Sequence, residues 1–205
     1  MIPRFITLEG TEGTGKTTQL HRLATALRDR GHIVTTTREP GGSRLGPDIR
    51  RWLLHSQDLE AATELFLLLA DRRQHVAEVI EPALQQGHIV LCDRFTDSTI
   101  AYQHYGRGLP LAWMMEANAL ATNGRQPDLT LLLVGDVAAC LHRAQQAKGG
   151  GDRLDRESLA FHQRVAQGFL DLAQQFPHRI QTIDANGDRD TVFQRIQQVL
   201  GAMIV

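Results

Sequence analysis

The 205-residue chain has few cysteines, few aromatic residues, almost no net charge and no long apolar run. Its two cysteines, Cys92 and Cys140, are too few for a disulfide framework, and neither has the spacing of a metal site. A formal net charge of −1 provides no overall attraction for nucleic acid or an anionic membrane, so we expect neither partner. No stretch approaches the roughly 20 apolar residues that span a bilayer. Because the first residues lead into a predicted strand and do not form a signal peptide, we expect a cytoplasmic protein.

Short apolar runs alternate with longer helical patterns along the whole chain. Runs such as HIVLCD and LTLLLV have consecutive apolar residues with no alternation, which is typical of strands buried on both faces of a parallel sheet. Strands are predicted at 5–9, 33–37, 89–93, 129–134 and 180–184. Helices are predicted at 16–30, 62–86 (with a bend near Pro82), 137–147, 158–175 and 191–203. This alternation predicts one α/β domain over 1–205, a three-layer sandwich with a five-stranded parallel sheet.

A glycine-rich segment, GTEGTGKTT at 10–18, follows the first predicted strand. The spacing Gly10-x-x-x-x-Gly15-Lys16-Thr17 matches the phosphate-binding loop (P-loop) in full. Glycines let several backbone N–H groups point at one anion, and the N-terminus of the next helix favours negative charge. Lys16 would contact the β- and γ-phosphates of a nucleotide, and the Thr17 hydroxyl would bind Mg²⁺. A glycine-rich helix cap would not explain Lys16-Thr17 at this offset. The sequence therefore predicts a P-loop NTPase fold whose nucleotide phosphates lie on Gly10, Thr11, Glu12, Gly13, Thr14, Gly15, Lys16, Thr17 and Thr18.

Charged residues follow two other predicted strands. Asp93 ends the third strand, where the second acidic residue of this fold class assists Mg²⁺. Arg94 comes next, and Arg38 occupies the matching position after the second strand, so both should face the crevice at the carboxyl ends of the strands. Together with Lys16 they gather more positive charge than the phosphates of one nucleotide need, which predicts a second phosphorylated ligand. A phosphate monoester is largely dianionic at neutral pH, so its phosphorylation needs positioning and charge neutralisation but no carboxylate base.

Several motifs, in order along most of the chain, resemble the thymidylate kinase family, which phosphorylates dTMP to dTDP with ATP. They are LEGTEGTGKTTQ, TREPGG, ELFLLLADRRQHV, CDRFTDSTIAYQ, GRG, PDLTLLL and DRLDRE. Apart from the P-loop each motif is weak alone, whereas the ordered set is highly specific. The resemblance implies ATP and Mg²⁺ as cofactors, dTMP as the acceptor, and a homodimer.

The resemblance also implies how the phosphate and sugar of dTMP are bound. Arg38 and Arg94 would hold the phosphate, and Arg50 would assist, although Arg50 is equally typical of an exposed helix residue. Glu12 would contact the 3′-hydroxyl of the sugar. Tyr102 would close the 2′ face of the sugar against ribose, or would be a core aromatic.

The base of dTMP would lie farther along the same site. Arg72 would hydrogen-bond its O4 edge, with Thr99 and Gln103 at the remaining edge. Leu68 stands where the family often has a phenylalanine against the face of thymine, and Phe66 is offset from that position by two residues on a helix. Leu68 can pack on the base but cannot stack as an aromatic ring does.

The glycine run KGGGDR at 148–153 predicts a lid around 143–156 that closes over ATP. The family places a catalytic arginine either in the P-loop or in the lid, and the loop here has none. The lid should therefore supply it, from Arg143, Lys148 or Arg153. The alternative for Arg153 is an ion pair with Asp155 or Glu157. The predicted catalytic residues are Lys16, Arg94, Arg143 and Arg153.

Three other functions are alternatives to this one. A GTPase switch usually carries an Asn-Lys-x-Asp motif, and the sequence has none. An ATP-dependent synthetase would need a carboxylate or amine pocket in place of arginines that grip phosphate. A kinase of another nucleoside monophosphate stays open, although Arg72, Thr99 and Gln103 favour a pyrimidine with a 4-oxo group.

Overall fold

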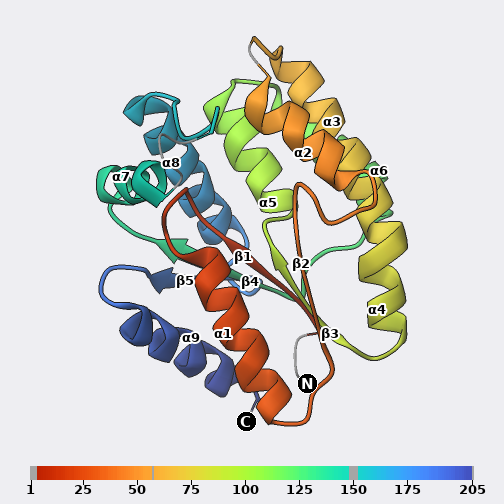
Figure 1. Ribbon diagram of the computed structural model, residues 1–205, viewed down its shortest axis with the longest axis vertical. Helices are drawn as coiled ribbons and strands as arrows, with labels where there is room; N and C mark the ends of the chain where they lie inside the picture. The colour runs from red at the N-terminus through yellow and green to blue at the C-terminus, as the bar shows by residue number, and fades with distance from the viewer. Residues whose placement is uncertain (1–3, 57, 148–151, 205) are drawn as a thin grey trace.

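The computed structural model describes residues 4–56, 58–147 and 152–204, and it contains one five-stranded parallel sheet with helices on both faces (Figure 1). The order in the sheet is β2-β3-β1-β4-β5, and every neighbouring pair is parallel. The strands are β1 (Phe5–Glu9), β2 (Val34–Arg38), β3 (Ile89–Asp93), β4 (Leu129–Val134) and β5 (Ile180–Asp184). The predicted α/β sandwich is confirmed, and only β2 is shifted, by one residue.

The helices α1 (Lys16–Asp29) and α9 (Arg189–Ile204) cover one face of the sheet. Leu20, Leu23 and Leu27 of α1 pack with Ile196 of α9 against the apolar side chains of the strands. The other face is covered by α3 (Ala61–His75), η1 (Val76–Ile80), α4 (Glu81–Gln85), η2 (Ile100–Gly106) and α8 (Leu159–Gln175). Since both faces are covered, the central strands can be mostly apolar, as their sequences are.

The long helix predicted at 62–86 is present as α3, η1 and α4 in direct succession. The middle part, η1, is a π-helix, and Pro82 lies at the start of α4. Proline lacks an N–H group and its ring crowds the carbonyl four residues earlier, so a wider turn before Pro82 lets the chain continue as a helix.

Three helical regions were not predicted, so the expected set of helices was incomplete. They are α2 (Gly46–His55), α5 (Thr96–Thr99) with η2, and α6 (Leu111–Thr122). The η2 segment is buried at five of its seven residues, so it shows no alternation of polar and apolar faces. The α6 sequence LAWMMEANALAT is mostly apolar and has no polar stripe to reveal its period. The remaining helix, α7 (Val137–Ala147), matches the prediction.

The carboxyl ends of β1, β2 and β3 lie level with one another. Asp93 of β3 is in register with Leu8 of β1 and with Arg38 of β2. The chain therefore leaves these strands at one edge of the sheet, where the strand order reverses on either side of β1. In open parallel sheets this is where ligands bind. Within the described ranges, no helix combines the length and apolarity needed to cross a membrane.

Candidate active site

The P-loop curls between β1 and α1. Gly10, Gly13 and Gly15 have φ angles of 136°, 72° and 88°, which side chains other than glycine rarely adopt. A Cβ at Gly13 would lie 1.8 Å from the carbonyl oxygen of Cys140 in α7, so the close approach of the loop to α7 also demands glycine there. Gly15 is the N-cap residue of α1, which places the loop at the positive end of that helix.

Lys16 folds back over the loop. Its ammonium Nζ donates to the carbonyl oxygens of Gly10 and Thr11, at 3.0 and 2.7 Å. Burial, followed by repulsion from Arg94, lowers the pKa of Lys16 to about 8. A buried cation held mainly by carbonyl dipoles is suited to a phosphate, whose negative charge would stabilise the charged form.

Thr17 and Asp93 form a possible metal site. The hydroxyl Oγ1 of Thr17 donates to Oδ2 of Asp93 at 2.5 Å. Mg²⁺ prefers oxygen ligands and is often held by one or two protein groups together with substrate phosphates. This hydroxyl and carboxylate, next to the P-loop, fit that requirement.

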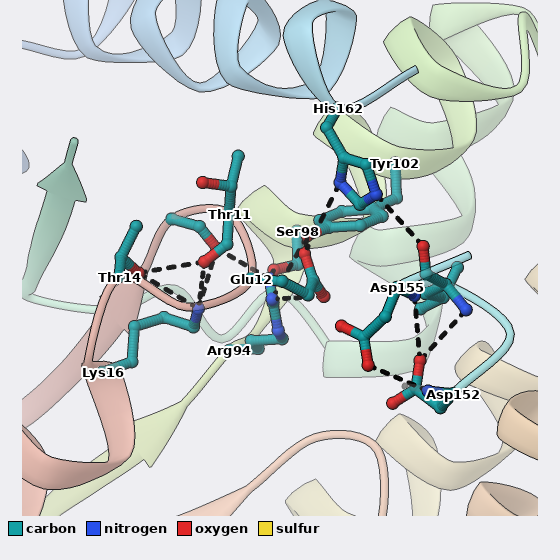
Figure 2. A network of polar contacts seen from close by, with 12 residues as sticks. Thr11, Glu12, Thr14, Lys16, Arg94, Ser98, Tyr102, Asp152, Asp155 and His162 are labelled. Atoms are coloured by element: carbon teal, nitrogen blue, oxygen red, sulfur yellow. Dashed lines mark hydrogen bonds and ion pairs between the residues drawn. The ribbon is translucent and has the colours of Figure 1, made fainter. Parts of the chain in front are cut away.

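Arg94 is aimed back at the P-loop by an unusual backbone conformation. Its φ is 71°, which is uncommon outside glycine, and its N–H donates to Leu8 across the sheet. Its Nη1 donates to the Gly10 carbonyl at 3.0 Å, and its Nη2 donates to Oε1 of Glu12 at 2.8 Å (Figure 2). Tyr102 also donates its hydroxyl to Glu12. Arg94 therefore joins the nucleotide loop to the rest of the site.

Glu12 is ionised in this network. Burial raises its pKa, but Arg94 and then Lys16 outweigh burial, and the pKa lies below its usual value. His162 of α8 lies next to it, with Nδ1 4.0 Å from Oε2 of Glu12, while Nε2 is 3.1 Å from the carbonyl of Leu154 (Figure 2). His162 of α8 thus connects the P-loop, at Glu12, with the segment that contains Leu154.

Glu9 supports the turn that carries Arg94. Its Oε1 accepts from the backbone N–H of Phe95 at 2.7 Å, and its Oε2 accepts from the hydroxyl of Ser98 at 2.5 Å. Ser98 in turn accepts from Nη1 of Arg94 at 3.1 Å. Complete burial, followed by the nearby negative charge of Asp97, raises the pKa of Glu9 to about 7.

A cavity of about 440 Å³ opens above these residues. Arg38, Arg50 and Arg94 all line it. Arg50 donates to the carbonyl of Pro40 at 2.9 Å, and its pKa is lowered by burial and then by repulsion from Arg38. Three guanidinium groups that repel one another at a cavity wall form an attractive site for a dianion.

Arg72 lies at the far end of this cavity and is only 2% exposed. Its Nε donates to Oε2 of Glu39 at 2.7 Å, and Nη2 lies 2.7 Å from the same oxygen. Its Nη1 donates to Thr99 and Asn118, at 2.7 and 2.6 Å. Since a guanidinium has five N–H groups, these contacts leave one on Nη2 for a ligand.

Gln103 lines the same end of the cavity. Its Nε2 donates to Oε1 of Glu64 at 2.8 Å, whereas its Oε1 is buried without a hydrogen-bond partner among the described residues. Leu68 also lines the cavity, while Phe66 is 67% exposed and does not. This end therefore offers a donor from Arg72, an acceptor from Gln103 and an aliphatic contact from Leu68.

The lid candidates lie in different places. Nη2 of Arg153 donates to Oε2 of Glu64 at 2.7 Å, and its Nε donates to the carbonyl of Leu53 at 2.9 Å, so Arg153 faces the far end of the cavity. Arg143 donates from Nη2 to Sγ of Cys140 at 2.9 Å, beside the P-loop. Lys148 and the predicted lid glycines lie outside the described residues. The backbone N–H of Arg153 donates to the carbonyl of Leu54 at 3.1 Å. Among the described residues, Arg153 is therefore held by α2 and α3, in place of the alternative ion pair with Asp155 or Glu157.

Comparisons with known proteins agree with this geometry. The family described as thymidylate kinase matches residues 8–196 of the sequence. The chain belongs to the thymidylate kinase family. A thymidylate kinase from Syntrophotalea carbinolica is 52% identical over 199 residues, which cover 94% of this chain and 92% of that protein. One from Thermosynechococcus vestitus is 51% identical and covers 97% of this chain and 87% of that protein. The crystal structure of a thymidylate kinase from Ehrlichia chaffeensis matches 98% of this chain and 99% of its own, with a TM-score of 0.80 and 36% identity.

Most residues that the motifs and the resemblance to thymidylate kinases predicted for the site come together in one cavity. Those that line it are Glu12, Gly13, Gly15, Lys16, Thr17, Thr18, Arg38, Arg50, Leu68, Arg72, Asp93, Arg94, Thr99, Tyr102, Gln103, Arg143 and Arg153. Gly10, Thr11 and Thr14 complete the loop around the Lys16 ammonium. Their binding roles stay predictions.

Several polar residues of the site were missed by the sequence analysis, namely Glu9, Glu39, Glu64, Asn118 and His162. Each acts on a predicted residue from another element, and no spacing in the sequence links it to its partner. Three of them had a local signal, since Glu9, Glu39 and Glu64 lie inside the LEGTEGTGKTTQ, TREPGG and ELFLLLADRRQHV motifs. Asn118 and His162 lie outside all of the motifs.

Proposed function

We propose that this chain transfers the γ-phosphoryl group of ATP to dTMP and so produces dTDP and ADP. Membership of the thymidylate kinase family supports this reaction. The lining of the cavity supports it as well, because it combines the P-loop with Lys16, three arginines, and the polar side chains of Arg72 and Gln103.

The choice of base rests on one observation, namely that Gln103 and Arg72 both line the cavity. The unpartnered Oε1 of Gln103 can accept a hydrogen bond, and Nη2 of Arg72 can donate one. Thymine presents an N3–H donor beside an O4 acceptor and complements both groups. Cytosine presents an amino donor and an unprotonated ring nitrogen at the same positions. A donor would then face Arg72, and an acceptor would face the oxygen of Gln103.

The phosphate of dTMP is placed between Arg38, Arg50 and Arg94, and its oxygen attacks the γ-phosphorus of ATP. A dianionic phosphate is already nucleophilic and needs no base. Arg94 also reaches the P-loop, so it lies where both phosphates would meet. Thr17 and Asp93 would hold Mg²⁺, which neutralises charge on the β- and γ-phosphates. Lys16 would then exchange loop carbonyls for phosphate oxygens.

Glu12 and Tyr102 are assigned to the sugar. Glu12 is ionised and can accept the 3′-hydroxyl of dTMP. The Tyr102 ring packs between Phe161 and Phe169, with ring centres 6.2 Å away in each case, and its hydroxyl is fixed on Glu12. A ring held so firmly cannot move aside for a 2′-hydroxyl. Tyr102 thus belongs to the core and can exclude ribose at the same time.

The test is an ADP-release assay with MgATP against dTMP, dUMP, UMP, dCMP and dGMP. We expect dTMP to have the highest kcat/KM. Loss of one buried methyl group costs about 1 kcal/mol, so dUMP should be about fivefold poorer, and UMP poorer again. A preference for dCMP or dGMP would favour a kinase of another monophosphate. ADP release that no acceptor stimulates would overturn the proposal.

We further propose a homodimer that buries one face of α2, α3 and α6. Trp52, Phe66 and Leu120 lie on these helices and are 59%, 67% and 81% exposed, and α3 contacts both α2 and α6 (Figure 1). Large exposed apolar side chains on adjacent helices are typical of protein interfaces. Light scattering should give the mass of a dimer, and Phe66→Glu should give the mass of a monomer.

Both cysteines are free thiols, which supports a cytoplasmic location.

A further inference from the structure

Glu64 of α3 is a buried carboxylate that contacts the base-reading end of the cavity and the lid side at once. It is 2% exposed, and each of its oxygens has its own partner. Oε1 accepts from Nε2 of Gln103 at 2.8 Å, and Oε2 accepts from Nη2 of Arg153 at 2.7 Å. The three residues come from α3, η2 and the segment after the lid glycines.

The contact with Glu64 determines which way the amide of Gln103 points. An amide has a donor end and an acceptor end of nearly the same shape, so packing alone does not distinguish them. An ionised carboxylate can only accept hydrogen bonds. Gln103 must therefore turn its NH₂ group to Glu64, and its oxygen becomes the buried acceptor that has no partner.

The second oxygen of Glu64 is tied to the lid side of the site. Arg153 is itself anchored to the end of α2, through its Nε on Leu53 and its backbone N–H on Leu54 at 3.1 Å. Arg107 also lies 3.4 Å from Oε2 of Glu64. Two guanidinium groups thus compensate the charge of Glu64 and keep its other oxygen available to Gln103.

We infer that Glu64 is a positioning residue that determines base specificity, because it holds the Gln103 amide with its oxygen toward the base. The inference rests on the proposed function, in which that oxygen accepts the N3–H of thymine. Glu64 itself does not touch the substrate. It also links the lid side to the base, since Arg153 and Gln103 share its carboxylate.

The test is Glu64→Gln, measured by the dissociation constants of dTMP and dCMP. A glutamine at 64 has the same shape but can donate as well as accept, so the Gln103 amide can take either orientation. We expect the ratio of the dCMP to the dTMP dissociation constant to fall at least about tenfold, which corresponds to about 1.4 kcal/mol. The same substitution in a Gln103→Ala background should leave the ratio unchanged, because the orienting contact has already been lost.

Glu60→Gln is the matched control. Glu60 precedes the same helix, and its side chain contacts the exposed start of α3 through Thr63, so removal of its charge should not alter the ratio. An unchanged ratio in a folded Glu64→Gln variant would overturn the inference, as would an equal effect in the Gln103→Ala background. If instead the parent enzyme itself does not prefer dTMP to dCMP, the proposed function fails before Glu64 is tested.

Discussion

The Thr17 hydroxyl and the Asp93 carboxylate, 76 residues apart in the sequence, are joined by a hydrogen bond of 2.5 Å at the mouth of the P-loop. The two groups have the chemistry of magnesium ligands. Thr17→Val keeps the shape of the side chain and removes its oxygen. We expect the Mg²⁺ concentration for half-maximal rate to rise by about tenfold or more, as is typical when a contact to a metal is lost.

This prediction is checked by titrating Mg²⁺ at fixed ATP. Thr25→Val serves as the control, because Thr25 lies on the same helix and donates its hydroxyl to the carbonyl of His21. Equal magnesium curves for the parent and Thr17→Val would remove Thr17 from the metal site.

Lys16→Met should abolish phosphoryl transfer and leave the fold intact. The carbonyls that Lys16 contacts keep other donors, since Gly10 also accepts from Arg94 and Thr11 also accepts from Thr14. The variant also removes a buried cation whose pKa is lowered to about 8 mainly by burial. Its thermal unfolding midpoint should therefore stay close to that of the parent, while turnover of dTMP is lost. A folded variant that keeps more than a few per cent of the activity would contradict the role given to Lys16.

Leu68→Phe should lower the KM for dTMP. Leu68 lines the base end of the cavity from α3, and stacking of an aromatic ring on a base contributes about 1–3 kcal/mol where the geometry allows it. Leu68→Ala is the opposite change and should raise the KM. A large rise in KM for a well-folded Leu68→Phe variant would show that this side chain does not face the base.

Glu9→Gln should stabilise the folded protein relative to the parent, and this gain should be larger at pH 8 than at pH 5. Burial and Asp97 raise the folded pKa of Glu9 to about 7, while Arg94 and Ser98 act against this rise. The folded state therefore binds more protons than the unfolded chain between about pH 4.5 and 7, and ionisation of Glu9 costs stability as the pH rises through that window. A glutamine can still accept from Phe95 and can donate to Ser98, and it has no charge to bury.

Urea unfolding at both pH values gives the test for Glu9. The difference in unfolding free energy between Glu9→Gln and the parent should grow by more than about 1 kcal/mol from pH 5 to pH 8, since one pKa unit corresponds to about 1.4 kcal/mol. A difference that does not change with pH would mean that Glu9 titrates at its ordinary value in the folded protein.

Arg143→Ala and Arg153→Ala should have different kinetic effects. Arg143 donates to Cys140 beside the P-loop, so its loss should lower kcat. Arginines that act on a transferring phosphoryl group can contribute about 10³–10⁵ in rate. Arg153 is held by Glu64 at the base end, so its loss should also raise the KM for dTMP. Steady-state kinetics and separate ATP binding distinguish the two. If both variants turn over dTMP within a fewfold of the parent, the catalytic cation lies elsewhere.

Local patterns were sufficient where a residue's role depends on its immediate neighbours in the chain. The P-loop needs glycines, Lys16 and Thr17 within nine positions, and all of these are adjacent in the sequence. The central strands are mostly apolar because helices cover both faces of the sheet, and the five strands were predicted to within one residue. Patterns failed for α6 and η2, because an element that is apolar or buried on most sides has no period to detect.

The sheet, the P-loop and the gathering of Arg38, Asp93 and Arg94 at one edge follow from the order of residues along the chain, because parallel strands bring their carboxyl ends together. Which polar groups bond one another and which are left for a ligand depends on how the folded elements pack. Glu64 orients Gln103 from 39 residues away, and Arg94 reaches Glu12 across 82. Hydrogen bonds depend on distances and angles between side chains on separate elements, and no spacing along the chain encodes them.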